Sequence, residues 1–345
     1  MEKQKRILIV RQDRIGDAVL STPIPLAIKK HWADSFVAVL VKNYTKDIYL
    51  NNPYVDKILC FEELDYSDFK SFVKAIKKIR QYKFTHALML LPSEKINYLL
   101  FFSGIKNRIG VGYKFYQFIT FVKGISRKKY KPLRHEADYS MDLARNLGVK
   151  QNELVPEIFL NIDEKEKVKI IKKDLLLNKK YLVGIHITSG NSAPNLSEED
   201  YLKLITELSK FKNYKIVITD NVVPKIIQNI ENVDYPNVNL SLRESILNFA
   251  ALDCLISAST GPMHIASALK VNTVSIFCPL EACSPKLWGP LGNNHKIILP
   301  RKNYCNTVCP GNPKICSYKG ESEAIIKEIV ISVHNILGNK NNNAD

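Results

Sequence analysis

The sequence of 345 residues lacks any apolar run near the ~18 to 20 residues that a membrane-spanning helix needs. Glycine and proline number only 14 and 16, which excludes collagen-like and disordered compositions. The basic start is followed by only four strongly apolar residues, Ile7–Val10, too few for the apolar region of a secretory signal peptide. We therefore expect a globular protein without a membrane span or a signal peptide.

Cysteine is also scarce, with seven residues scattered through the chain. An odd number at such distances does not form a disulfide framework, so a reducing cytoplasmic location is the expectation. Cys305, Cys309 and Cys316, preceded by Cys283, lie close enough in sequence to suggest zinc or an iron–sulfur cluster. Because no Cys-x2-Cys pair exists and the spacing matches no standard site, reduced thiols are the preferred interpretation.

Acidic residues are too few to balance the basic ones. Asp and Glu number 34 against 50 Lys and Arg, which leaves a net charge of +16. A cationic surface attracts phosphates, anionic lipids or nucleic acid. Residues 95–135 contain ten Lys or Arg, no Asp or Glu, and many aromatic residues. No nucleic-acid module signature accompanies them, so nucleic acid is not an expected partner. The alternative to a binding surface for an anionic ligand or lipid is a solvated basic surface over an aromatic core.

Apolar strand-length runs alternate with helix-length segments in both halves of the chain. We expect strands at 7–10, 36–41, 57–61, 86–91, 181–187, 215–219, 254–257 and 273–277. Helices are expected at 18–31, 69–82, 164–177, 198–211, 245–252 and 321–337. The alternation predicts two doubly wound α/β domains, 1–165 and 166–338, followed by a frayed tail at 339–345.

The loop Arg11–Asp17 separates the first expected strand from the first helix. Gly16 lets the backbone turn closely, and Asp17 then lies at or near the helix N-terminus, where the dipole favours its ionised form. That suits a general base, and an ordinary N-cap aspartate is the alternative. Asp13 is the competing base, although its place before Arg14 favours an ion pair. The absence of Gly-x-Gly-x-x-Gly weakens an NAD interpretation.

Two loops in the second half combine strand ends with small hydroxylated residues. In Ser259–Leu269 a strand delivers Ser, Thr and Gly to a helix start, whose free N–H groups suit a diphosphate. Pro262 fits the first turn, and His264 either reaches the same anion or is a satisfied structural residue. Thr188 and Ser189 follow another strand and could donate to a phosphate, with ordinary loop composition as the alternative.

These motifs, in this order, resemble glycosyltransferase family nine, the ADP-heptose:lipopolysaccharide heptosyltransferases. The resemblance extends over most of the chain, in Ile7–Arg11 with Gly16 and Asp17, Asn52–Asp56, Arg108–Gly112, Gly184–His186 and Ser259–Leu269. It implies a GT-B fold, in which two Rossmann-like domains face each other across a cleft. The first domain would bind the acceptor and the second the nucleotide sugar, with no cofactor.

The resemblance also implies roles for individual residues. The family's catalytic aspartate falls on Asp17, with Gly16 supporting its loop. The donor-side residues are Thr188, Ser189, Thr260, Gly261, Pro262, Met263 and His264. One departure is 193–197, which lacks the basic residue and the Trp-Pro pair that follow this loop in many relatives.

The implied reaction is an inverting transfer of heptose, from ADP-heptose, onto a lipopolysaccharide core acceptor. Metal independence is expected because the sequence contains no Asp-x-Asp. Arg127, Lys128 and Lys129 would face a phosphorylated, lipid-anchored acceptor or the anionic inner leaflet, which implies a cytoplasmic enzyme at the membrane periphery. The alternatives are transfer from another nucleotide sugar and nucleotide-sugar binding without turnover, against which the intact Gly16-Asp17 pair argues.

Overall fold

The structure is a computed structural model that describes residues 4–64, 68–127, 130–150, 152–312 and 314–338. The chain divides into two compact units, Met1–Phe159 and Leu160–Asp345. This division precedes helix α7 (Ile162–Leu176), whereas the expected boundary at 165 lies inside that helix. An ion pair of 2.7 Å between Glu164 and Arg243 joins α7 to the second unit.

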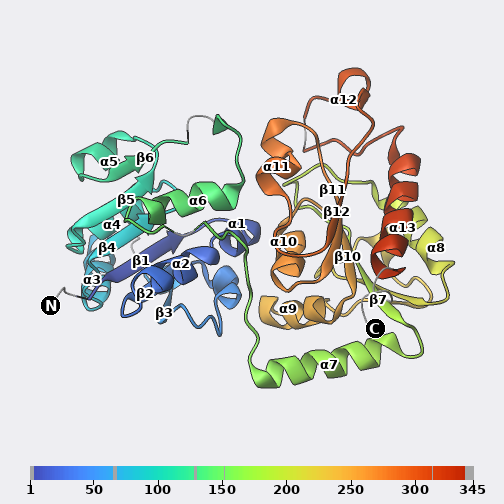
Figure 1. Cartoon of the computed structure of the whole chain (residues 1–345), viewed down its shortest axis with the longest axis horizontal. Helices are drawn as coiled ribbons and strands as arrows, with labels where there is room; N and C mark the ends of the chain where they lie inside the picture. Colours follow the sequence, from blue (N-terminus) through green and yellow to red (C-terminus); the bar gives the residue numbers. More distant parts are fainter. Residues whose placement is uncertain (1–3, 65–67, 128–129, 151, 313, 339–345) are drawn as a thin grey trace. The chain divides into compact units, whose positions relative to one another are not determined.

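The first unit is built on one sheet. Among its described residues, six parallel strands follow the order β3-β2-β1-β4-β5-β6 (Figure 1). They are β1 (Arg6–Arg11), β2 (Phe36–Val41), β3 (Lys57–Cys60), β4 (His86–Met89), β5 (Asn107–Val111) and β6 (Lys123–Ile125). The central strand β1 carries four consecutive apolar residues that are all buried. Such a run is typical of a parallel strand that is covered on both faces.

The helices of the first unit flank this sheet. They are α1 (Ile15–Leu20), α2 (Pro23–His31), α3 (Phe69–Arg80), α4 (Glu94–Phe102), α5 (Phe115–Ile119) and α6 (Glu136–Arg145), with 3-10 turns η1 (Asn43–Ile48) and η2 (Phe61–Glu63). The helix expected over 18–31 is interrupted between α1 and α2. Pro23 has no backbone N–H, so it cannot continue the hydrogen bonds of α1. It stands instead in the first turn of α2, where that N–H is not needed.

The second unit repeats the architecture. Among its described residues, six parallel strands follow the order β12-β11-β10-β7-β8-β9. They are β7 (Tyr181–His186), β8 (Tyr214–Ile218), β9 (Val233–Asp234), β10 (Cys254–Ala258), β11 (Asn272–Ile276) and β12 (His295–Ile298). The other helices are α8 (Glu198–Ser209), α9 (Leu242–Ala251), α10 (Gly261–Ala268), α11 (Pro285–Trp288), α12 (Tyr304–Thr307) and α13 (Ser322–Gly338), with η4 (Lys225–Ile227) and η5 (Glu281–Cys283). The doubly wound α/β prediction is confirmed for both units.

Each sheet has a point where the chain changes its direction of winding. In the first unit this point lies between β1 and β4, and in the second between β7 and β10. The carboxyl ends at such switch points are where doubly wound sheets bind ligands. The expected catalytic and donor-side residues lie in the segments that leave β1, β7 and β10, either in the loop or in the first turns of α1 and α10. No helix in the described part of the chain has the length and apolarity to cross a membrane.

Candidate active site

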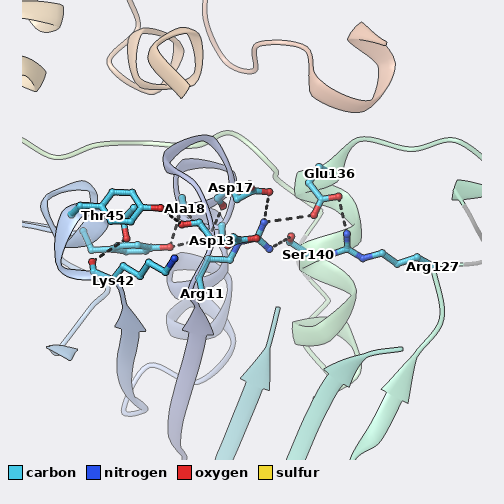
Figure 2. Close-up of polar contacts among 12 residues, drawn as sticks. Arg11, Asp13, Asp17, Ala18, Lys42, Thr45, Arg127, Glu136 and Ser140 are labelled. Atoms are coloured by element: carbon cyan, nitrogen blue, oxygen red, sulfur yellow. Dashed lines mark hydrogen bonds and ion pairs between the residues drawn. The ribbon is translucent and has the colours of Figure 1, made fainter. Parts of the chain in front are cut away.

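Arg11, the last residue of β1, is the centre of a buried polar network. Its side chain is 2% exposed and three carboxylates surround it (Figure 2). Asp13 Oδ1 lies 2.7 Å from Nε, Asp17 Oδ1 lies 2.5 Å from Nη2, and Glu136 Oε1 lies 3.8 Å from Nη2. Burial acts to lower the pKa of Arg11, but the three carboxylates outweigh it and leave that pKa raised. One guanidinium is therefore the shared partner of three acids at the first switch point.

Asp17 lies in the first turn of α1 but does not cap it. The N-cap is Arg14, and no side chain bonds to the helix end there. Asp17 Oδ1 instead accepts a hydrogen bond from Arg11 Nη2, and among the described residues nothing donates to Oδ2. The side chain is 18% exposed. The N-cap interpretation is thus wrong, and Asp17 is an oriented carboxylate with one oxygen available to a ligand.

Asp13 pairs with Arg11 and not with its sequence neighbour Arg14. The 2.7 Å contact is an ion pair by distance, although the N–H of Arg11 Nε does not point at the oxygen. Burial raises the pKa of Asp13 to about 6, with Arg11 opposing and Asp17 reinforcing the rise. Asp13 therefore lies near Asp17 as a second carboxylate that can hold a proton at mildly acidic pH.

Glu136 extends the network to Arg127. It is the first residue of α6, its side chain is 2% exposed, and its Oε2 accepts a hydrogen bond of 2.9 Å from Arg127 Nη1. Burial raises the pKa of Glu136, with Arg127 and Arg11 opposing. Arg127, expected at an acceptor or membrane surface, is only 19% exposed and belongs to this network. Lys128 and Lys129 lie outside the described residues.

The buried hydroxyl of Tyr49 fixes the C-terminal part of α1. Its hydroxyl lies 2.8 Å from Ser21 Oγ and donates to the carbonyl of Ala18 at 3.0 Å. Burial raises the pKa of Tyr49 to about 12, so the hydroxyl stays protonated. The break between α1 and α2 is therefore tied down at Ser21, and the helix turn that carries Asp17 has a defined position.

In the second unit, α10 begins at the carboxyl end of β10. Thr260 is its extended N-cap, without a side-chain cap bond, and Gly261 and Pro262 follow in the first turn. Among the described residues, nothing accepts from the backbone N–H groups of Gly261 and Met263. A helix start with free N–H groups is an anion site by construction.

Three of the expected donor residues are buried. Thr260 is 7% exposed, Met263 0% and His264 5%, and the Thr260 hydroxyl donates to the carbonyl of Ala258 at 3.4 Å. Met263 therefore offers a backbone N–H to a ligand, while its side chain packs inside the unit. The burial of His264 agrees with its structural interpretation, and no ligand contact is needed to explain it.

The loop after β7 is held by an acid that the sequence analysis did not identify. Asp220 is 1% exposed and follows β8; its two oxygens accept from the backbone N–H groups of Ile187 and Thr188, both at 2.8 Å. His186 Nε2 lies 3.5 Å from the same carboxylate, and burial lowers the pKa of this histidine. Asp220 therefore fixes the backbone of this loop on its buried side. The side chains that follow remain accessible, since Thr188 is exposed and Ser189 half-buried.

The two loops of the second unit come together because β7 and β10 are neighbours. The parallel strands pair in register, with His186 opposite Ser257, and both chains leave the sheet at the same edge. Thr188 and Ser189 therefore lie beside the loop that opens α10. Hydroxyls from one loop and backbone N–H groups from the other form a candidate diphosphate site.

The C-terminal cysteines are free thiols. A hydrogen bond with Cys278 lowers the pKa of Cys283 to about 7, and the hydroxyl of Tyr304 lies 3.6 Å from Cys316 Sγ. Within the described ranges, no group of three or more His, Cys, Asp or Glu side chains could hold a metal ion.

Comparisons with known proteins agree with this architecture. A sequence model described as "Glycosyltransferase family 9 (heptosyltransferase)" matches residues 72–311. A Haemophilus influenzae protein, named only provisionally as a glycosyltransferase, is 26% identical over 357 residues, with 98% of this chain and 99% of that protein covered. Lipopolysaccharide heptosyltransferase 1 of Campylobacter coli is 22% identical, with 93% and 97% covered.

A solved structure shows the same fold. The E. coli ADP-heptose lps heptosyltransferase II matches with a TM-score of 0.70 at 17% identity, covering 94% of this chain and 99% of that chain. The family match spans more than half of the sequence, and both units have the doubly wound strand order that a GT-B enzyme requires. The chain therefore belongs to glycosyltransferase family 9, the heptosyltransferase family, and is a glycosyltransferase of GT-B fold.

Proposed function

We propose that this glycosyltransferase transfers heptose from ADP-heptose to a lipopolysaccharide core acceptor, with inversion and without a metal ion. The observation that carries the proposal is the Asp17 carboxylate, held by buried Arg11 at the first switch point. The names of the similar proteins support the substrates, since one is a lipopolysaccharide heptosyltransferase and another uses ADP-heptose.

Asp17 is proposed as the general base. As the acceptor hydroxyl attacks the anomeric carbon, its proton passes to Asp17 Oδ2, and the bond from that carbon to the diphosphate oxygen breaks on the opposite face. A single displacement of this kind inverts the configuration. Arg11 holds Oδ1 and so orients the carboxylate, and Asp13 is the rival base because burial raises its pKa to about 6.

The second unit is proposed to bind the donor diphosphate. Thr188, Ser189 and Thr260 supply hydroxyls, and Gly261 and Met263 supply backbone N–H groups at the positive end of α10. Negative charge builds up on the leaving nucleotide in the transition state, so these fixed donors would stabilise it. Pro262 and His264 would shape the turn.

Metal independence is proposed from the groups already present on the two sides. On the acceptor side, the Arg11 guanidinium contacts three carboxylates, and Arg127 pairs with one of them, Glu136. The donor side offers hydroxyls and N–H groups, which bind a diphosphate directly. Neither half of the proposed reaction therefore calls for a divalent ion.

A different nucleotide sugar is the second candidate for the donor. The segment 193–197 lacks the basic residue and the Trp-Pro pair of many relatives. Asn195 within it is already engaged, since it donates to the carbonyl of Ile187 at 2.5 Å and accepts from Tyr201 at 2.6 Å. Asn195 therefore supports the loop from inside and does not replace the absent phosphate contact.

The acceptor is proposed to bind the first unit at the cytoplasmic face of the inner membrane. The proposed acceptor is phosphorylated and anchored in an anionic leaflet, and residues 95–135 contain basic residues but no acids. Arg127 would act through Glu136 and the Arg11 network, while Lys128 and Lys129 are proposed contacts of the acceptor or of the anionic leaflet. Nucleic acid is not proposed as a partner.

The test is a panel of nucleotide sugars with a lipopolysaccharide core acceptor. We expect ADP-heptose to raise the melting temperature, because a ligand at about 100 times its Kd stabilises the native state by about 2.7 kcal/mol. We also expect a product whose new glycosidic bond has the opposite anomeric configuration to the donor. Stabilisation and transfer with another nucleotide sugar alone would select the second candidate, and binding without transfer to any acceptor would contradict the enzyme proposal.

A further inference from the structure

One corner of the first unit exposes aromatic side chains to an unusual degree. Tyr113, Phe115, Phe118 and Phe121, which we call the aromatic knob, are 73%, 79%, 78% and 80% exposed. They fall within nine residues of sequence, on and around α5, and Phe115 and Phe118 share a helix face by their i, i+3 spacing. Single exposed apolar residues are ordinary, but a contiguous group marks an interaction surface.

The buried side of the same segment is polar. Gln117 and Thr120 are each 2% exposed, and Asn97 beneath them is 0% exposed. Asn97 Nδ2 donates to Thr120 Oγ1 at 2.6 Å, and Gln117 Nε2 donates to the carbonyl of Val111 at 3.1 Å. A water-facing helix normally buries its apolar residues and exposes its polar ones. Around α5 this arrangement is reversed.

The knob is also held in place. Arg108 donates to the carbonyl of Thr120, and a Cβ on Gly124 would lie 2.6 Å from the ring of Tyr113, so this ring packs on β6. Phe121 has a φ of 56°, in the left-handed region that favours glycine or asparagine. Left-handed backbone also occurs at ten other described non-glycine residues, so it is the exposure of the Phe121 side chain that bears on the surface.

The charge around the knob identifies the surface that covers it. Lys114 within it and Lys123 just after it are exposed, and no acid occurs from 95 to 135. We infer that the aromatic knob inserts into the interface of an anionic lipid bilayer, with Lys114 and Lys123 on the lipid headgroups. A second copy of this chain would bring two like-charged patches together, which opposes self-association through this face.

The position of the knob links it to the candidate active site. It precedes β6, the edge strand of the first sheet, and Figure 1 shows α5 beside β6. Two residues after β6 comes Arg127, which bonds to Glu136 in the Arg11 network. Lipid insertion would therefore hold the proposed acceptor side near the headgroups. The inference rests on the proposed function for its purpose, whereas lipid binding itself requires no substrate.

The test is flotation of the whole protein with phosphatidylcholine vesicles, with and without phosphatidylglycerol. We expect binding to the anionic vesicles, and a loss of affinity of about tenfold or more in F115S/F118S/F121S, since each buried phenylalanine contributes strongly to insertion. The control is Phe69→Ser, because Phe69 is 82% exposed at the start of α3, outside the knob. Lys114→Glu with Lys123→Glu should also weaken binding, whereas Lys319→Glu in the second unit should not.

A second measurement does not depend on the stability of the triple variant. Phe118→Trp should show a blue shift of its emission with anionic vesicles, relative to the parent, and Phe69→Trp should show none. Equal vesicle affinity of parent and triple variant would overturn the inference, as would concentration-dependent dimers that the triple substitution abolishes. ADP-heptose binding, measured on the same proteins without lipid, separates a failure of this inference from a failure of the proposed function.

Discussion

At the residue scale, Asp17 and Asp13 contact the same guanidinium and are equally exposed, but they contact it differently. Asp17 Oδ1 accepts a directed hydrogen bond from Arg11 Nη2, whereas Asp13 Oδ1 is buried against Nε without one. The hydrogen bond fixes the orientation of Asp17, which a general base needs. The two side chains therefore lend themselves to a direct comparison of matched variants.

Asp17→Asn should lower kcat by ~10² or more, the usual scale for a lost general base. Asparagine keeps the shape of the side chain but cannot take the acceptor's proton. Donor affinity should hardly change, because the proposed donor residues all belong to the second unit. Steady-state kinetics beside ligand-binding titration checks this. Asp13→Asn is the matched control, and an active Asp17→Asn with an inactive, folded Asp13→Asn would move the base to Asp13.

Asp13 also predicts a pH dependence of stability. Its folded pKa of about 6 lies above the ordinary 3.8, so between these values the native state binds more protons than the unfolded state. The unfolding free energy should therefore fall as pH rises through this window. Relative to the parent, Asp13→Asn should gain on the order of 1–3 kcal/mol across it. Denaturant titrations at several pH values check this, and a constant difference between the two proteins would contradict it.

At the scale of elements, the strand ends could be predicted from the sequence and the helix ends less well. Strands buried on both faces are continuous apolar runs, so β1, β2 and β7 were located within a residue or two. The single helix expected over 18–31 is broken between α1 and α2, because proline is tolerated at a helix start but not inside a helix.

The residues that complete the site could not be predicted, because their partners are distant in sequence. Glu136 reaches Arg11 across more than a hundred residues, and Asp220 anchors Thr188 from a different strand. A carboxylate at a helix start or after a strand is common in any α/β protein. Only the tertiary fold shows which of these carboxylates contacts a buried arginine or accepts from a backbone N–H.

Helix α10 supplies a prediction of its own. Gly261→Val places a branched side chain at the first position of the helix, where the proposed diphosphate approaches the backbone. We expect the affinity for ADP to fall about tenfold or more, while the unfolding free energy changes little. Calorimetric titration checks this. Gly338→Val is the control, because a Cβ there meets nothing within 4 Å, and unchanged ADP affinity in a folded Gly261→Val would remove α10 from the donor site.

At the scale of the whole molecule, the two units resemble each other in strand order but not in what their switch points display. The first presents a buried cation among carboxylates, and the second presents hydroxyls and free N–H groups. The same connectivity thus supports opposite electrostatic tasks, which loop residues determine. Composition and strand pattern could predict the shared connectivity and the hydroxyl-rich loops, whereas the Arg11 network became visible only in the fold.

The Arg11 network has a consequence for inheritance. Arg11, Asp13, Asp17 and Glu136 all precede residue 160, so one gene segment encodes the whole constellation. A recombination that joins this segment to a foreign second half would carry the proposed base intact, together with its buried counter-charge. Under the proposed division of roles, a lineage could exchange the sugar it transfers in one event without rebuilding the chemistry that attaches it.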